Sequence, residues 1–272
     1  MISTLVLSAL TALPLTAAAP QDSFAEQVKE YKAILDDRER ESEAIALIDA
    51  FATRYAEHDA RLVEIADMLD IDEGDPKALK KEAKDLQGEQ EDLADLAYLA
   101  FKERKRDTEG HRRLWKGAIF ALGQMGESGA ELLWKVYGDK RFKKSEEVDF
   151  RVACVEQVGA TRDWKQWEEL VDLLDHHEDQ IIAAAASALK NYRDAPGKIR
   201  LEACGKLVNF LNSYYNAASN PEDTTARQRY RMVNRPMLDA LSEMTGQTFP
   251  KPLDWRKWYN DNKKDKKLWS DD

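Results

Sequence analysis

The sequence predicts an all-α protein in which antiparallel helix pairs stack side by side into an α-α superhelix. Apolar residues recur at helical spacing through almost all of the 272 residues. Glycine and proline, which interrupt helices, number only 12 and 8. In the second half of the chain, one register of small and apolar residues returns several times. Charged residues make up 34% against 43% hydrophobic residues, and this balance is typical of amphipathic helices with solvated outer faces.

The start of the chain has the pattern of an export signal. An apolar run at residues 5–15 is followed by three alanines at 17–19, and no charged residue interrupts either segment. Such a run is too short to span a bilayer and is typical of a secretory signal peptide. We therefore expect residues 1–19 to be a signal peptide, with cleavage between Ala18 and Gln21 and a periplasmic or extracellular product. The alternative is a buried N-terminal helix. No later stretch has the roughly 18 apolar residues of a membrane span.

Residues 22–105 are expected to form helical hairpins with less regular repeats. The sequence Ser23-Phe-Ala-Glu26 is a capping box that predicts the start of a first helix. A second helix is expected at about 42–57 and a third through 62–69. A fourth begins at Pro76, with Asp75 as its N-cap, and ends near residue 105. The apolar positions that should face the core are Phe24, Val28, Tyr31, Leu35, Ile45, Ile48, Ala52, Tyr55, Leu62, Ile65, Ala66, Leu69, Leu79, Leu86, Leu93, Leu96 and Phe101.

Residues 106–262 contain four segments that share one pattern: a small residue, an apolar residue, two polar residues and a second apolar residue. The apolar anchors Leu122, Val155, Leu189 and Leu241 are spaced by 33, 34 and 52 residues. Two spacings near 33 indicate helix-pair repeats, and the longer third spacing indicates an insertion in the last interval. One such pair cannot cover its own apolar face, so the pairs are expected to stack. The expected facing sets are Leu114, Trp115, Ala118, Leu122 and Met125 with Leu132, Leu133, Val136 and Tyr137; Val148, Val152, Val155 and Val158 with Trp167, Leu170, Val171 and Leu174; and Ile181, Ile182, Ala185, Leu189 and Tyr192 with Leu201, Cys204, Val208 and Leu211.

The end of this region completes a resemblance to a known family. It reads Thr245-Gly-Gln-Thr-Phe249 and then Trp255-Arg-Lys-Trp258. With the repeated units, this ending resembles exported bacterial HEAT-repeat proteins, in which a Thr-Gly-Gln-x-Phe turn links the last helix pair and a Trp-x-x-Trp helix closes the stack. The resemblance covers about 109–262. It implies a HEAT-like solenoid and a general role in binding, and it carries over no catalytic residue.

The last helix is expected to close the array. Trp255, Trp258 and Tyr259 fall on one helical stripe, so the two tryptophans are expected to pack against the helix that carries Leu238, Leu241 and Met244. Gly246 would stop the preceding helix. The alternative is an exposed Trp clamp for a ligand. Residues 263–272 are expected to be a polar tail, whose basic segment 263–267 is either solvated or a docking site.

No group of residues in the sequence indicates catalysis. There is no Gly-x-Ser-x-Gly elbow and no Gly-rich phosphate loop. The acidic segment that starts at Asp70 resembles a calcium loop, but Asp75 and Lys81 occupy the positions that need Gly and Glu. It is therefore read as an acidic turn before a helix. We expect no catalytic residue, no cofactor and no metal.

The histidines and cysteines have structural interpretations. His176 and His177 are adjacent, and neighbouring residues of a helix point about 100° apart, so we expect the pair to end a helix in solvent rather than to bind a metal. Cys154 occupies the register position of Ala121 and Ala188 and is read as a small buried hydrophobe. A disulfide between Cys154 and Cys204 is the alternative.

The expected function is therefore binding. The net charge of −10 argues against nucleic acid as the partner. Trp134 lies off the apolar stripe of its helix, either as an exposed contact residue or packed on a neighbouring repeat or on the N-terminal helices. The acids Glu168, Glu169 and Asp172 mark a second helix of the repeats. These four residues are the expected contacts of a non-enzymatic exported scaffold for a protein or peptide.

The alternative function is a helical enzyme or ligand-binding protein. Its site would lie between the N-terminal hairpins and the solenoid. A deep pocket there, holding inward-facing acids or His58 and His111, would favour it.

Overall fold

The protein is all-helical over the residues that the structure, a computed structural model, describes: 24–37, 40–103 and 108–271. No strand occurs within these ranges, which confirms the all-α fold class. The signal peptide expected at 1–19 and the Ser23 cap lie outside the described residues. The helices are α1 (Phe24–Asp36), α2 (Glu41–Asp70), α3 (Pro76–Glu103), α4 (Glu109–Leu122), α5 (Gly126–Tyr137), α6 (Val148–Ala160), α7 (Trp167–Asp172), α8 (Asp179–Leu189), α9 (Gly197–Ala218), α10 (Thr224–Thr245) and α11 (Pro252–Asn262).

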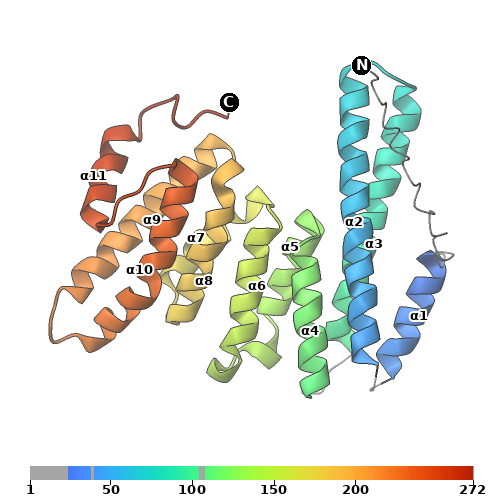
Figure 1. Cartoon of the computed structure of the whole chain (residues 1–272), viewed down its shortest axis with the longest axis horizontal. Coiled ribbons are helices and arrows are strands. Elements are labelled where there is room, and N and C mark those ends of the chain that lie inside the picture. Colours follow the sequence, from blue (N-terminus) through green and yellow to red (C-terminus); the bar gives the residue numbers. More distant parts are fainter. Residues whose placement is uncertain (1–23, 38–39, 104–107, 272) are drawn as a thin grey trace, which may run out of the picture.

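The helices lie side by side along the long axis of the molecule, from α1–α3 at one end to α11 at the other (Figure 1). Helix α2 packs on α3 and α4, and α4 in turn packs on α5 and α6. Further along, α6 contacts α8, α8 contacts α10, and α9 lies between α10 and α11. The remaining helices also contact one another: α3 packs on α5, and α7 packs on α9. Each helix therefore packs on its neighbours in the row.

Helix α2 corrects one expectation, because it runs unbroken for 30 residues where two helices were predicted. Polar residues at 57–59 and 61 interrupt the apolar stripe, and this interruption predicted a break between two helices. None of them is Gly or Pro, so nothing in the backbone stops the helix. Their side chains instead bind α3: Arg61 Nε lies 2.7 Å from Glu82 Oε1, and the Gln90 amide donates to Asp59 Oδ1 at 2.6 Å.

The turn between α2 and α3 has the predicted cap. The Lys77 backbone N–H donates to Asp75 Oδ1 at 3.0 Å, and Pro76 opens the helix. Asp72 and Gly74, with φ of 55° and 83°, supply the left-handed backbone that reverses the chain. The acidic segment from Asp70 is thus a helix-connecting turn.

The repeated register lies in the core as predicted. The anchors Leu122, Val155, Leu189 and Leu241 are fully buried, and so are the small residues before them, Ala121, Cys154, Ala188 and Ala240. Small side chains at this position let successive helices approach closely. A Cβ added to Gly159 of α6 would lie 2.5 Å from the Cα of Ala188 in α8.

Helix α6 differs from its predicted stripe at its first turn. Val148 and Val152 are only half-buried, and Phe150 is the buried residue there. The Phe150 ring stacks on Phe142 at 4.7 Å and meets Trp115 edge-on at 6.0 Å. Two 3₁₀ turns, Lys140–Phe142 and Ser145–Glu147, precede α6 and bring Phe142 to this cluster. The spacing of the valines describes only residues of the helix itself. It could not predict that an aromatic residue from a preceding turn would pack there.

Helix α11 is buried at Trp255 as expected, but chiefly against α9 rather than α10. Pro252 O accepts from the Asn212 amide at 3.2 Å, and the Tyr259 hydroxyl lies 3.4 Å from Leu201 O, both on α9. Gly205 leaves room for this approach, since a Cβ there would lie 2.4 Å from the Tyr259 hydroxyl. Gly246, with φ of 69°, stops α10 as predicted.

The segment after α11 packs back onto the fold. Its lysines are exposed, but Trp269 is half-buried, and its indole N–H donates to Asn262 O at 3.0 Å. The Arg200 guanidinium donates to Ser270 O at 2.6 Å. This segment therefore covers the end of α9 as well as carrying charge.

Candidate functional site

The residues expected to contact a partner lie on and beside two neighbouring helices, α5 and α7. Trp134 of α5 is half-buried, and its indole N–H donates to Gln166 Oε1 at 2.8 Å in the 3₁₀ turn that leads into α7. Its ring also meets Tyr137 edge-on at 5.5 Å. Trp134 is thus held against the next repeat, which is the second of the two readings of its position.

Three acids on α7 face solvent. Glu168, Glu169 and Asp172 are exposed, and none forms an ion pair with another residue in the described part of the chain. Lys165, in the preceding turn, donates instead to Glu127 of α5 at 2.5 Å. The carboxylates of α7 are therefore available to a cationic partner.

A pocket of about 480 Å³ lies between the N-terminal hairpin and α5. It is lined by residues of α2, α3 and α5: Tyr55, Gln87, Gln90, Glu91, Asp95, Glu127, Ser128, Glu131, Leu132 and Lys135. Four carboxylates stand against one ammonium group, and Leu132 is the only aliphatic side chain. A ligand of this pocket would be polar and positively charged.

The carboxylates of the pocket come as two like-charged pairs. Glu91 and Asp95 are four residues apart on α3, and Glu127 and Glu131 are four residues apart on α5. Residues at this spacing are neighbours on a helix surface, and like charges there cost about 0.2–0.5 kcal/mol per pair. Sequence reasoning did not single out these acids, although their repeated spacing off the apolar stripe was a signal that could have found them.

The floor of the pocket holds neutral hydrogen-bonding groups. Tyr55 and Gln90 are only 4% and 6% exposed. Burial, and then the nearby Asp59 carboxylate, raise the pKa of Tyr55 to about 12, so its hydroxyl keeps its proton. The Gln90 amide nitrogen donates to Asp59 Oδ1 and, at 3.4 Å, to Tyr55 O. The Gln90 carbonyl oxygen accepts no hydrogen bond from a described residue.

The two histidines considered for this region do not line the pocket. His58 is buried, with Nε2 3.5 Å from Glu89 Oε2. His111 is buried at the start of α4, where its backbone N–H donates to Thr108 and its ring lies 6.2 Å from Trp115. Acids line the pocket between the hairpin and the repeats, but they are exposed to solvent, and the two histidines lie elsewhere.

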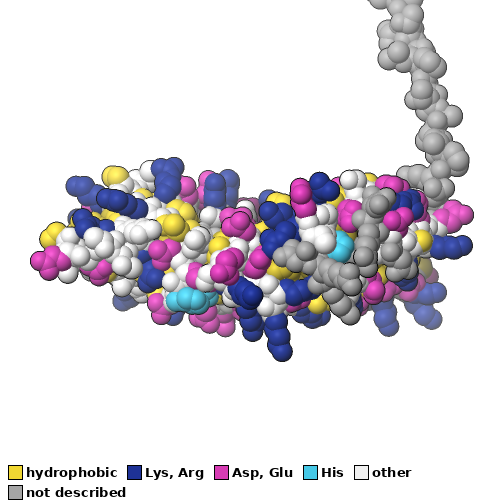
Figure 2. All heavy atoms as spheres, turned by 90° about the horizontal axis from the view of Figure 1, so that it is seen from below, with side chains coloured by type: hydrophobic (Ala, Val, Ile, Leu, Met, Phe, Trp, Pro, Cys, Tyr) yellow, Lys and Arg dark blue, Asp and Glu magenta, His cyan; other side chains and the backbone are white. Residues whose placement is uncertain are grey.

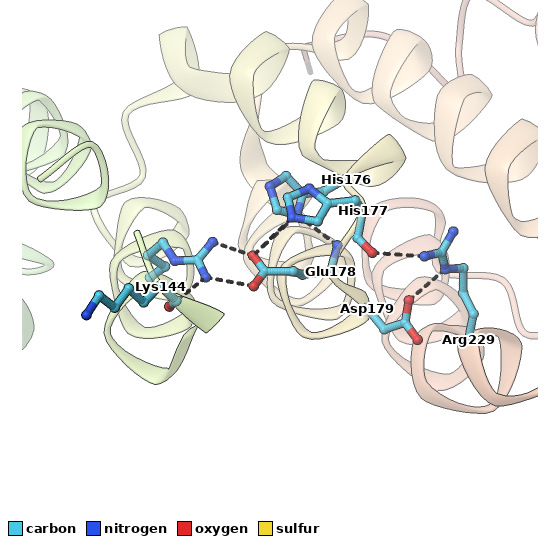
Figure 3. Close-up of polar contacts among 7 residues, drawn as sticks. Lys144, His176, His177, Glu178, Asp179 and Arg229 are labelled. Carbon is cyan, nitrogen blue, oxygen red and sulfur yellow. Dashed lines mark hydrogen bonds and ion pairs between the residues drawn. The ribbon is translucent and has the colours of Figure 1, made fainter. Parts of the chain in front are cut away.

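A second polar cluster lies where α8 begins (Figure 3). His176, His177 and Glu178 bring potential ligand atoms within 4.8 Å of one another, and they are the one such group among the residues described. Glu178 Oε2 is 3.9 Å from both His176 Nδ1 and His177 Nε2. The histidines follow the end of a helical segment as expected, because His176 is the C-cap of the 3₁₀ turn Leu173–Asp175 that continues α7. The backbone of His176 is extended, however, so the pair lies in the loop before α8. The 100° argument for adjacent helical residues therefore does not apply, and their rings lie 4.2 Å apart.

The surroundings of this cluster favour a structural clamp over a cation site. The Arg151 guanidinium of α6 binds both oxygens of Glu178, and this hydrogen-bonded pairing lowers the pKa of that carboxyl. The backbone N–H of Glu178 already occupies His176 Nδ1 at 3.1 Å. The positive end of the α8 dipole also opposes a cation here. Arg229 of α10 binds Asp179 Oδ1 at 2.6 Å and His177 O at 2.9 Å, so the cluster ties α6, α8 and α10 together.

The two cysteines do not form a disulfide with each other. Cys154 and Cys204 are both free and fully buried, and burial raises the pKa of each thiol. Of the two readings, the buried thiol is the one found. Such thiols are weak nucleophiles because the thiolate is the reactive form.

Comparison with known proteins finds no match: no protein-family model fits the sequence, and neither a curated protein nor a solved structure resembles it. The site must therefore be interpreted from its own chemistry. Within the described ranges, no helix combines the length and the hydrophobicity that crossing a bilayer requires.

Proposed function

We propose that this chain is an exported, non-enzymatic scaffold that presents an acidic helical surface to a protein or peptide partner. In this proposal the helix pairs of residues 106–262 form a HEAT-like solenoid. The solenoid continues the N-terminal hairpin, and the apolar start of the sequence directs export. The exposed acids of α3, α5 and α7 form the binding surface. Nucleic acid is not the partner, because the net charge is −10.

The packing order supports the solenoid part of the proposal. Helices α4, α6, α8 and α10 contact one another in sequence and form one row. In the second row, α3 contacts α5, α7 contacts α9, and α9 contacts α11. Two parallel rows of this kind are what stacked antiparallel pairs produce. The closing motif at Gly246, Phe249 and Trp255 supports a terminal cap, since the Trp255 indole N–H donates to Phe249 O at 2.9 Å.

The observation that carries the binding role is the set of exposed, unpaired carboxylates on α7. A protein surface needs charged residues to stay in solution, but solubility alone does not require charges of one sign on α3, α5 and α7. The acids of α7 follow those of α3 and α5, with the turn before α7 bonded to α5 through Lys165 and Gln166. Figure 2 shows Lys and Arg side chains spread along the length of the molecule, interspersed with Asp and Glu side chains.

A charge-neutralised variant tests this role. The mature chain carrying Glu168→Gln, Glu169→Gln and Asp172→Asn would be compared with a control carrying Glu57→Gln, Asp67→Asn and Asp70→Asn. The control changes the net charge equally at exposed positions of α2. Partners captured from the exported fraction are identified by mass spectrometry, and their affinities for the variants are then measured with purified proteins. We expect the α7 variant to bind at least about 10-fold more weakly and the control to bind as the parent does. Equal binding by both variants would contradict the proposal.

The pocket supports a second candidate, a ligand-binding protein with its site between the N-terminal hairpin and α5. Four acids line this pocket of about 480 Å³, with their side chains exposed to solvent. Native mass spectrometry of the protein purified from its own cells separates the candidates. A bound small cation of constant mass would favour the ligand-binding protein, whereas a ligand-free chain that captures a partner protein favours the scaffold.

A further inference from the structure

We propose that an exposed ridge of α3 is a self-association surface, on which a second copy of this chain packs its own α3 in the antiparallel direction. The ridge consists of Lys81, Lys84, Gly88, Glu91 and Asp95, and all five residues are exposed. They are spaced three or four residues apart, so they lie in one row along the helix. Partner binding by the acids of α7 is a separate proposal, and neither depends on the other.

The charge of this ridge is divided at Gly88. The two residues before the glycine are lysines, and the two after it are acids. None of these four side chains forms an ion pair with another residue of the described chain. Other charged side chains of the hairpin do, since Arg61 binds Glu82 and Arg54 lies 3.5 Å from Glu89. The ridge therefore presents opposite charges that the described fold leaves unpaired.

A two-fold axis at Gly88 makes this row of charges complementary to itself. Lys81 lies seven residues before Gly88 and Asp95 seven residues after it, so each is about 10 Å from the glycine along the helix. In an antiparallel pair of α3 helices, Lys81 of each copy therefore lies opposite Asp95 of the other, and Lys84 lies opposite Glu91. Two-fold symmetry forms each of these pairs twice. A parallel pair would instead place lysine against lysine.

Gly88 is a second observation that indicates a partner at this position. Glycine in the middle of a helix is less stable than alanine, so its presence there needs a reason. The described fold supplies none, because a Cβ at Gly88 would meet no atom within 4 Å, whereas one at Gly159 would meet α8. The missing side chain lets the backbone of a second helix approach closely where the two α3 helices cross.

The ridge is accessible to a second copy. Helices α2 and α3 project beyond α4 and α5, their neighbours in the row (Figure 1). The exposure of all five ridge residues shows that no described helix covers them. Exposed ion pairs are individually weak, and the contact is a single pair of helices. We therefore expect a dimer that forms only at high protein concentration.

Sedimentation velocity of the intact mature chain tests this contact. We expect the parent to pass from monomer to dimer between about 10 and 500 µM. Lys81→Glu/Lys84→Glu places acids against acids, and Glu91→Lys/Asp95→Lys places lysines against lysines, so each variant alone should dimerise at least about 10-fold more weakly. An equimolar mixture of the two restores every pair and should dimerise as the parent does. Both variants stay net acidic, since the parent carries −10, so net charge does not draw them together.

Two further variants serve as controls. Lys190→Glu/Lys257→Glu changes the net charge as much as the lysine variant does, at exposed positions outside α3, and should dimerise as the parent does. Gly88→Leu fills the crossing point and should weaken the dimer at least about 10-fold. Its urea midpoint, measured at a concentration where the parent is monomeric, should not fall, because the new side chain meets no atom of its own chain.

Three results would overturn the proposed contact. They are a parent that stays monomeric over this range, charge variants that dimerise as the parent does, and folded variants whose mixture remains monomeric. Unfolding curves that match the parent verify the fold of each variant. The scaffold proposal is tested separately by the α7 variant, so the failure of one proposal is distinguishable from the failure of the other.

Discussion

Trp255 is the aromatic residue that anchors α11 at the end of the row of helices. It is fully buried, it meets Phe249 edge-on at 5.0 Å and Trp258 at 5.8 Å, and its indole nitrogen is hydrogen-bonded. A buried tryptophan with a satisfied N–H combines a large apolar contact with no desolvated polar group. This environment is that of a core residue, and it excludes Trp255 from the exposed clamp that was the alternative reading.

We predict that Trp255→Ala lowers the free energy of unfolding by about 3–5 kcal/mol, because it leaves a large cavity between α11 and α9. Urea unfolding followed by circular dichroism measures this loss. Phe120→Ala is the control, since Phe120 is a large aromatic residue that is 54% exposed, and it should change stability by less than about 0.5 kcal/mol. Equal effects of the two substitutions would show that Trp255 is not part of a packed core.

We predict a pH effect from His176. Burial, and then the charge of His177, lower the pKa of His176, so folding favours its neutral form. Its contribution to stability is therefore complete above the unfolded pKa of about 6.5 and is lost as the pH falls through the lower folded pKa. The urea midpoint of the parent should fall between pH 7.5 and 5 more steeply than that of His176→Asn. Asparagine keeps an acceptor for the Glu178 N–H but does not titrate, so identical slopes would contradict the prediction.

At the scale of helices, the sequence predicted that each helix exists better than it predicted where the helix ends and which helices it packs against. The anchors Leu122, Val155 and Leu189 are all fully buried, as predicted, because helical periodicity reports burial directly. The length of α2 was missed because contacts with α3 outweigh the interrupted stripe at 57–61. The partner of α11 was missed for the same reason: periodicity shows which face is buried but not which helix covers it. His176 was correctly expected at the end of a helical segment, but its extended backbone, which lets its ring lie beside that of His177, is a loop conformation that helical periodicity does not report.

Two glycines on different helices should respond oppositely to alanine. A Cβ at Gly159 would lie 2.5 Å from the backbone of α8, whereas a Cβ at Gly88 of α3 would meet nothing within 4 Å. Gly159→Ala must push α6 from α8, and we predict a loss of about 1–3 kcal/mol in the free energy of unfolding. Gly88→Ala should gain about 0.5–1 kcal/mol, because alanine loses less backbone entropy in a helix. Thermal unfolding of both proteins checks the opposite signs, and a loss in Gly88→Ala would contradict this packing.

At the scale of the whole molecule, the pocket is the feature that sequence reasoning could not place. Tyr55, Gln90 and Glu131 come from three helices, and the packing of α3 on both α2 and α5 brings them together. The sequence did indicate that inward-facing acids between the hairpin and the repeats would mark a site. It could not choose which acids, since charged residues cover every outer face. The acids of α7 were identified from their position on a second helix, which depends only on local periodicity.

The row of helices makes a prediction about how far a local change spreads. Packing between α1–α3 and the rest passes through α4 and α5, while α11 packs on α9 at the opposite end. In a stacked array each unit contacts only its neighbours, so stability is approximately a sum of local terms. We therefore predict that Trp255→Ala lowers the protection of backbone amides against hydrogen exchange in α9, α10 and α11 and leaves α2 and α3 as they are. Ile48→Ala, at a fully buried position of α2, should do the reverse. Hydrogen exchange read by mass spectrometry resolves the two ends, and a uniform loss of protection along the chain in either variant would mean one cooperative globule instead of a solenoid.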